Sequence, residues 1–156
     1  KLLSDDTEGG KKSTEFIQGA WEKLPGLTVT NQNVPFKTRL QRSQNGNFDT
    51  VISAWNADFT DPISFLSLFT SDNSYNNGKY DSAAYDDAVK KAEGADANNK
   101  TARWADMVAA EKQLMNDQGV IPIYQQASAT LTRSNLKGII YNTAGSNYNF
   151  KYMSVK

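Results

Sequence analysis

The stretch that decides the fold class runs from residue 11 to residue 30 and reads KKSTEFIQGAWEKLPGLTVT. Its large apolar residues recur at the spacing of one helix face, which predicts an amphipathic helix over 11–24 that ends at Pro25-Gly26. Residues 27–30 then alternate as a β-strand does, and residues 1–4 read as an earlier strand. A helix between two strands is typical of a βαβ unit, so the sequence predicts an α/β fold.

The rest of the chain continues the alternation of helices and strands. We expect a helix that starts at Pro35 and stops at Asn45-Gly46, a buried strand at 48–55, a short helix at 61–69 and a polar loop at 70–80. Helices near 82–93 and 99–117, a strand at 120–124, and short strand pieces over 139–155 with a break at 142–147 should follow. Trp21 and Trp104 lie on apolar helix stripes and are predicted to pack in the core. The sequence therefore predicts a single domain over residues 1–156 with a central sheet.

Composition excludes several classes of chemistry. The chain has 17 Lys+Arg, 17 Asp+Glu, no cysteine and no histidine. Balanced charge without a basic stripe argues against a nucleic-acid partner. Thiol nucleophiles, Cys/His zinc sites and histidine general bases are excluded within this chain. The acidic residues near 72–87 lack the calcium-loop pattern, so we expect no metal and no cofactor.

The ends and the hydropathy of the chain lead to two further expectations. No apolar run approaches the roughly 18 residues that cross a bilayer, and no signal-peptide core opens the sequence. The chain starts with Lys1-Leu2-Leu3-Ser4, which reads as a strand already under way. We therefore expect the chain to be a fragment of a longer protein.

The segment from Trp55 to Pro62, which reads WNADFTDP, directly follows the predicted strand at 48–55. Ligands of open α/β sheets bind beyond the carboxyl ends of strands, so this segment is the candidate site. Asp58 lies between the apolar residues Trp55 and Phe59, where a carboxylate would hold an ammonium group with a charge-assisted bond of about 1.5–3 kcal/mol. Asp61 is predicted to cap the following helix.

Two alternatives stay open around this segment. Trp55 is equally suited to the core and to the wall of a ligand pocket. The amide-rich loop at 73–78 is either a solvated turn or a source of neutral hydrogen-bond partners for a peptide backbone. Asp58 and Asp61 together also permit a carboxylate-only hydrolase, which only their separation in space would test.

Three segments in the same order resemble one protein family. Residues 55–66 read WNADFTDPISFL and resemble the Trp-x-x-Asp-(aromatic or Asn)-x-(Asp/Glu)-Pro-x-x-Phe-Leu motif of oligopeptide- and dipeptide-binding proteins, the solute receptors of ABC peptide importers. Residues 77–86 are similar to that family's Asn-x-x-x-Tyr-x-Ser-x-x-(Tyr/Phe)-Asp segment, and residues 121–124 match the strand after its long helices. The resemblance covers nearly the whole chain.

The resemblance implies a class II periplasmic-binding-protein-like receptor with two hinged lobes, of which this chain would be the C-terminal lobe. That lobe would have a central mixed sheet flanked by helices. The aspartate matching Asp58 would pair with the α-amino group of a peptide, Trp55 would line the adjoining pocket, and backbone groups near Asn56 would contact the peptide chain. The expected ligand-binding residues are Trp55, Asn56, Ala57, Asp58 and Phe59.

The same resemblance implies the partners and the location. The implied partners are a peptide ligand, the membrane permease subunits of an ABC transporter and the N-terminal lobe of the same receptor. The protein would be extracytoplasmic, either a cell-surface lipoprotein or periplasmic, and not an enzyme. A receptor for nickel, haem or an oligosaccharide and a surface interaction domain are the alternatives. The role of the residue matching Asp58 can be lost in receptors for long peptides, so ligand length stays open.

Overall fold

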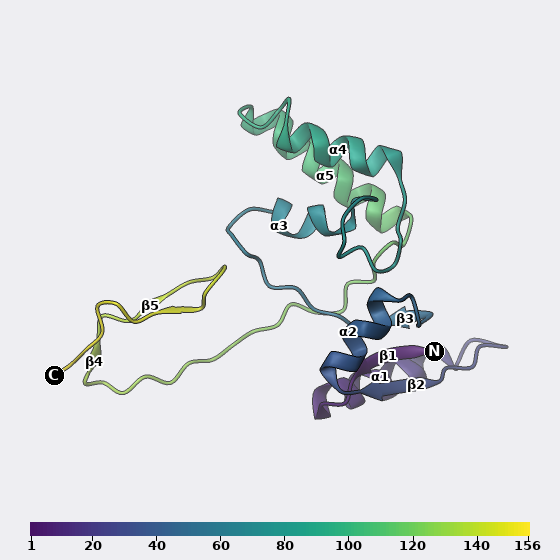
Figure 1. The fold of residues 1–156 in the computed structure, drawn as a ribbon, viewed down its shortest axis with the longest axis horizontal. Helices are drawn as coiled ribbons and strands as arrows, with labels where there is room; N and C mark the ends of the chain where they lie inside the picture. The colour runs from purple at the N-terminus through teal and green to yellow at the C-terminus, as the bar shows by residue number, and fades with distance from the viewer. The chain divides into compact units, whose positions relative to one another are not determined.

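The computed structural model describes residues 1–156 (Figure 1). These residues divide into two compact units. Unit 1 contains residues 1–55 and 74–79, and unit 2 contains residues 56–73 and 80–156. None of the helices combines the length and the apolar character that crossing a membrane requires. The single domain expected over residues 1–156 stays a prediction, and each unit is described by itself.

Unit 1 is built on a small parallel sheet with the strand order β2-β1-β3. The strands are β1 (Leu2–Asp5), β2 (Asn31–Val34) and β3 (Thr50–Val51). Leu2 of the central strand pairs with Asn31 on one side and with Thr50 on the other. Leu2 and Leu3 are fully buried, because a central parallel strand is covered on both faces.

Two helices connect the three strands of unit 1. Helix α1 (Glu8–Trp21) joins β1 to β2, and helix α2 (Phe36–Gln44) joins β2 to β3. The hydroxyl of Thr7 accepts the Gly10 N–H at 3.1 Å and so caps α1. The predicted βαβ unit and the helix that begins after Pro35 are therefore confirmed.

The second strand begins later than predicted, at residue 31 in place of 27–30. Three of its four side chains are polar, and α1 holds two of them: Asn31 donates to Gln18 at 2.6 Å, and Asn33 donates to Thr14 at 3.2 Å. Side-chain hydrogen bonds to α1 thus help to hold this strand in the sheet, and the strand lacks the alternation of apolar and polar residues that would have marked it in the sequence. The third strand is also shorter than the predicted 48–55, since only two residues pair.

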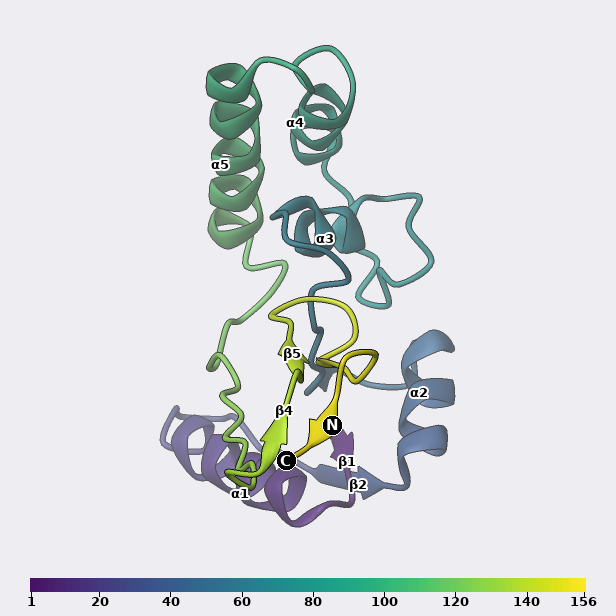
Figure 2. The same cartoon turned by 90° about the vertical axis from the view of Figure 1, so that its left-hand side faces the viewer.

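Unit 2 has a helical part made of three α-helices. They are α3 (Ile63–Leu66), which continues into the 3-10 turn η1 (Ser67–Phe69), then α4 (Ala83–Glu93) and α5 (Lys100–Asn116). Helices α4 and α5 lie side by side in both views (Figure 1, Figure 2). Ser82 and Asn99 cap them, each accepting a backbone N–H from three residues further on. The three predicted helices are confirmed.

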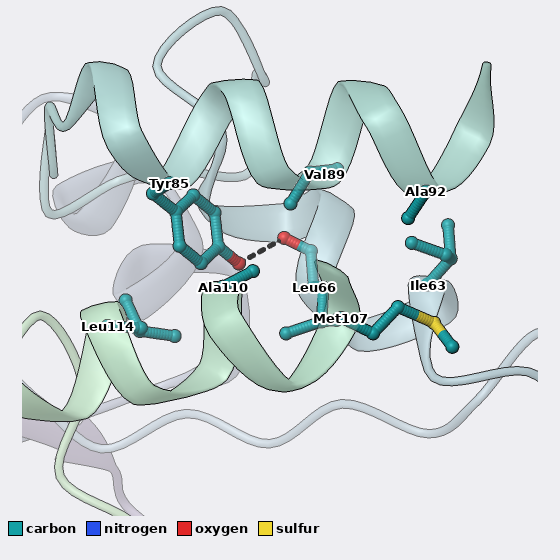
Figure 3. Packing of buried hydrophobic residues seen from close by; sticks show 8 residues of the cluster. All are labelled: Ile63, Leu66, Tyr85, Val89, Ala92, Met107, Ala110 and Leu114. Atoms are coloured by element: carbon teal, nitrogen blue, oxygen red, sulfur yellow. Dashed lines mark hydrogen bonds between the residues drawn. The ribbon is translucent and has the colours of Figure 1, made fainter. Parts of the chain in front are cut away.

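A compact apolar core joins these helices (Figure 3). It consists of Ile63, Leu66, Tyr85, Val89, Ala92, Met107, Ala110 and Leu114. The Tyr85 hydroxyl donates to the carbonyl oxygen of Leu66, so α4 holds α3 by a buried hydrogen bond as well as by packing.

Three sequence predictions about burial and strands are wrong. Trp104 is 60% exposed, because α5 turns the stripe of Met107, Ala110 and Leu114 toward α4. In α1, Phe16 belongs to the predicted apolar face of the helix but is 77% exposed. Residues 120–124 form no strand, since no strand of this chain lies beside them to accept their backbone hydrogen bonds.

The last part of unit 2 forms two antiparallel ribbons. Strand β4 (Leu136–Lys137) pairs with β7 (Ser154–Val155), and β5 (Ile140–Tyr141) pairs with β6 (Tyr148–Asn149). The turn between β5 and β6 spans residues 142–147, where the sequence predicted a break between strand pieces. All antiparallel pairing in the chain is in these ribbons, while the central sheet is parallel.

Candidate functional site

Along the sequence, the predicted ligand segment contains the point where unit 1 ends and unit 2 begins. Trp55 is the last residue of this part of unit 1, and residues 56–59 begin unit 2. Trp55 and residues 56–59 are consecutive in the chain, but their surroundings are described separately because they belong to different units.

In unit 1 the Trp55 ring packs edge-on against the ring of Tyr75. The ring centroids are 4.8 Å apart and the rings are inclined by 66°, which is a favourable aromatic geometry. Tyr75 is 60% exposed, and the indole Nε1 of Trp55 is buried without a hydrogen-bond partner. The sequence placed Tyr75 in a loop rich in amide and hydroxyl groups, but no local signal indicated its contact with Trp55.

In unit 2 the side chain of Asp58 is exposed and makes no hydrogen bond or ion pair with the chain. Its backbone, by contrast, is held. The Asp58 N–H donates to the Ser64 hydroxyl at 2.8 Å, and the carbonyl of Ala57 accepts from the Gly145 N–H at 2.8 Å. An unpaired carboxylate therefore projects from a fixed piece of main chain.

Asp61, the second carboxylate of the segment, has a structural task. Its Oδ1 accepts the N–H of Ile63, the first residue of α3, at 2.9 Å. Arg103 of α5 donates two hydrogen bonds to the same carboxylate, at 2.7 and 3.0 Å. The hydrogen bonds from Arg103 are the main reason that the pKa of Asp61 lies below its ordinary value. Pro62 and not Asp61 is the N-cap residue of α3, but the Asp61 carboxylate holds the start of the helix as predicted, and its bonds to Arg103 join it to α5.

An open, mainly apolar hollow of about 370 Å³ lies along the same segment of unit 2. Its lining residues are Ala57, Phe59, Thr60, Asp61, Pro62, Phe65, Thr143 and Ala144. Phe59 and Phe65 are each about half exposed there. The sequence pointed to Ala57 and Phe59, but it did not point to the turn at 143–144, which reaches this place through the tertiary fold.

The five predicted site residues therefore fall into two groups. Ala57, Asp58 and Phe59 lie together in unit 2, with Asn56 exposed beside them, and Trp55 lies against Tyr75 in unit 1. No group of three or more acidic side chains converges on one point, so the residues present offer no ligand set for a metal ion.

Comparison with known proteins gives consistent likenesses. Residues 1–77 match the sequence model of the bacterial extracellular solute-binding proteins, family 5 Middle. The chain is 39% identical to the dipeptide-binding protein of Lactococcus lactis subsp. cremoris over 97% of its own length and 28% of the relative. It is 36% identical to the periplasmic murein peptide-binding protein MppA of Escherichia coli, over 90% of this chain and 26% of that protein.

Solved structures agree with the sequence comparison. The structure of Listeria monocytogenes OppA bound to peptide matches with a TM-score of 0.82 at 38% identity, over 99% of this chain and 29% of that one. The pheromone receptor PrgZ matches with a TM-score of 0.85 at 36% identity, over the same shares. These likenesses confirm the predicted α/β fold of the class II periplasmic-binding-protein type. The chain spans between a quarter and a third of the length of these relatives.

Proposed function

This chain belongs to the bacterial extracellular solute-binding proteins of family 5, and on that premise we propose that it is one lobe of a receptor that binds oligopeptides for an ABC importer. The receptor would be two-lobed, with this chain as the C-terminal lobe. Its partners would be the peptide, the permease subunits and the N-terminal lobe. The receptor would lie outside the cytoplasm, in the periplasm or anchored to the cell surface as a lipoprotein. The relatives named as dipeptide-, oligopeptide- and murein peptide-binding proteins support this ligand class.

The observation that carries the proposal is the free carboxylate of Asp58. It is exposed, it has no partner within the chain, and the main chain on its N-terminal side is hydrogen-bonded at both polar atoms. A charged acceptor without an internal partner is suited to the α-ammonium group of a peptide, which would supply a charge-assisted hydrogen bond.

The neighbouring residues support a binding mode that tolerates different peptide sequences. Trp55 and Phe59 offer apolar surface on either side of Asp58 in the sequence, and Asn56 offers an exposed amide. Main-chain hydrogen bonds to an extended peptide give affinity with little dependence on its side chains. We propose Trp55, Asn56, Ala57, Asp58 and Phe59 as the ligand-binding residues.

The proposed receptor has no catalytic role. A hydrolase that used Asp58 and Asp61 would need one of them as a proton donor. The other carboxylate would act as nucleophile or base. Arg103 lowers the pKa of Asp61 and donates to both of its oxygens, so Asp61 is poorly suited to either role. The carboxylate pair is thus better explained by one ligand contact and one helix cap.

The test is the affinity of the full-length receptor for a peptide with a free amino terminus, measured by calorimetry. Asp58→Asn should weaken binding roughly tenfold to a hundredfold, because a hydrogen bond between charged groups is replaced by a weaker neutral one. Asp72→Asn is a matched control, since it removes the same charge from another exposed position of unit 2. Equal affinities for the two variants would contradict the proposed role of Asp58.

A further inference from the structure

Both polar atoms of the peptide group that joins Ala57 to Asp58 are hydrogen-bonded. Its carbonyl oxygen accepts the Gly145 N–H at 2.8 Å, and its N–H donates to the Ser64 hydroxyl at 2.8 Å. Ser64 belongs to α3, and Gly145 belongs to the turn between β5 and β6. Two bonds at opposite ends of one planar group prevent that plane from rotating about the chain.

The Ser64 hydroxyl, which accepts one of these two hydrogen bonds, belongs to a residue packed in the helical core of unit 2. Ser64 is only 3% exposed, and its neighbour Leu66 accepts the buried hydrogen bond from Tyr85. The first residue of the same helix is held by Asp61, which Arg103 holds in turn. The Ser64 oxygen is therefore placed by the core and not by a mobile surface chain.

The Gly145 side requires glycine for two reasons. Its φ is +68°, in the left-handed region that favours glycine. A Cβ added there would stand 3.0 Å from the carbonyl oxygen of Asp58, closer than ordinary contact. Asn142 closes the turn by donating its backbone N–H to Asn147 at 3.0 Å and its side-chain amide to the Ser146 carbonyl at 2.8 Å.

We propose that Ser64 and Gly145 are positioning residues that fix the direction in which the Asp58 carboxylate meets the ligand, an inference that rests on the proposed peptide-binding function. The Asp58 side chain has no partner of its own, so its average direction follows from its backbone. With the preceding peptide plane fixed, the carboxylate changes direction only through the φ torsion of Asp58 and its side-chain torsions. Loss of either bond lets the carboxylate sample more directions, which lowers the affinity for an ammonium group at a fixed place.

The test compares variants of the full-length receptor with a free-amine peptide and its N-acetylated twin. Ser64→Ala and Gly145→Ala should each reduce the preference for the free amine roughly threefold to tenfold, the range expected when one hydrogen bond is lost. Affinity for the N-acetylated peptide should stay unchanged, because that peptide has no ammonium group. Ser64→Thr keeps the hydroxyl acceptor and should restore the preference.

Two matched controls separate positioning from general damage. Ser67→Ala removes a hydroxyl from the turn directly after α3, where it bonds to the Ile63 carbonyl and not to Asp58. Gly46→Ala introduces alanine at the same φ of +68°, but in open space. Both controls should leave the preference for the free amine unchanged.

The outcomes distinguish this inference from the proposed function. If Asp58→Asn abolishes the preference while Ser64→Ala and Gly145→Ala leave it intact, the positioning role is wrong and the function stands. If the wild-type protein shows no preference, both are wrong. If the variants weaken both peptides equally, Ser64 and Gly145 are only structural. Hydrogen exchange at the Asp58 amide of the ligand-free wild type gives a test without substitution: the amide should be protected, and fast exchange would overturn the inference.

Discussion

Replacing Tyr85 with phenylalanine removes one buried hydroxyl and leaves the packing of the ring in place. Tyr85 is fully buried, its ring meets that of Tyr80 edge-on at 5.4 Å, and its hydroxyl donates to the Leu66 carbonyl. Burial raises the pKa of Tyr85, so the hydroxyl is a neutral donor throughout the usual pH range. The variant should therefore lose one hydrogen bond without opening a large cavity.

The expected loss in stability follows from the kind of bond that is removed. A net hydrogen bond contributes about 0.5–1.5 kcal/mol, and a buried carbonyl that is deprived of its partner adds a desolvation cost, so we expect a loss of about 1–3 kcal/mol. The effect should reach α3, which carries Ser64 and accepts the bond through Leu66. Tyr85→Phe thus tests the link between the core and the ligand segment.

Hydrogen exchange of the α4 and α5 amides under native conditions is the suitable assay, because it reports the opening of these helices whatever else the chain is joined to. Tyr80→Phe is the control, since the Tyr80 hydroxyl bonds to Asp117 in an exposed place and its loss should cost less than the loss of the buried Tyr85 hydroxyl. If Tyr85→Phe accelerates exchange no more than Tyr80→Phe does, the reasoning about the buried hydroxyl is refuted.

Three further predictions concern the same unit. Because Arg103 lowers the pKa of Asp61 in the folded state, their bridge stabilises the protein above the unfolded carboxyl pKa of about 3.9 and loses this effect as the pH falls through the lower folded value. Arg103→Met should therefore flatten the acid side of a stability-against-pH curve from urea unfolding, and an unchanged curve would contradict this. Leu114→Ala should lose about 2–5 kcal/mol in urea unfolding, because its side chain is buried between helices, and a loss below 1 kcal/mol would show that this core is loosely packed. Trp104→Ala should change stability by only about 0.5 kcal/mol, since the ring is mostly exposed, whereas a loss of 3 kcal/mol or more would restore it to the core.

The elements that local signals specify were predictable. Ser82 and Asn99 are good cap residues directly before apolar periodic segments, and both begin helices where the sequence indicated. Pro35 and the Asn45-Gly46 pair likewise bound α2, because proline suits a helix start and Gly46 adopts a positive φ after the end.

The elements whose structure depends on residues distant in the sequence could not be predicted. Strand β2 is polar, and its place in the sheet rests on side-chain bonds from Asn31 and Asn33 to α1, which no apolar alternation reveals. The choice of the buried face of α5 is similar: apolar residues lie on more than one side of this helix, and the position of α4 decides that Met107 is buried and Trp104 is not.

The candidate site likewise has contacts that could be predicted from the sequence and contacts that could not. Asp58 and Asp61 belong to one short segment, so their separate roles as free carboxylate and helix cap could be argued from spacing alone. Gly145 lies in a turn far along the chain, and the Tyr75 ring contact with Trp55 crosses a loop. Both contacts arise from tertiary folding, for which a single sequence carries no local mark.

The central claim is that Asp58 receives the amino terminus of a peptide, and a double-mutant cycle tests it most directly. Calorimetry on the full-length receptor would measure four affinities, for wild type and Asp58→Asn, each with a free-amine peptide and its N-acetylated twin. We predict a coupling free energy of about 1.5–3 kcal/mol between the substitution and the acetylation. A coupling of zero, with both changes acting independently, would contradict the account.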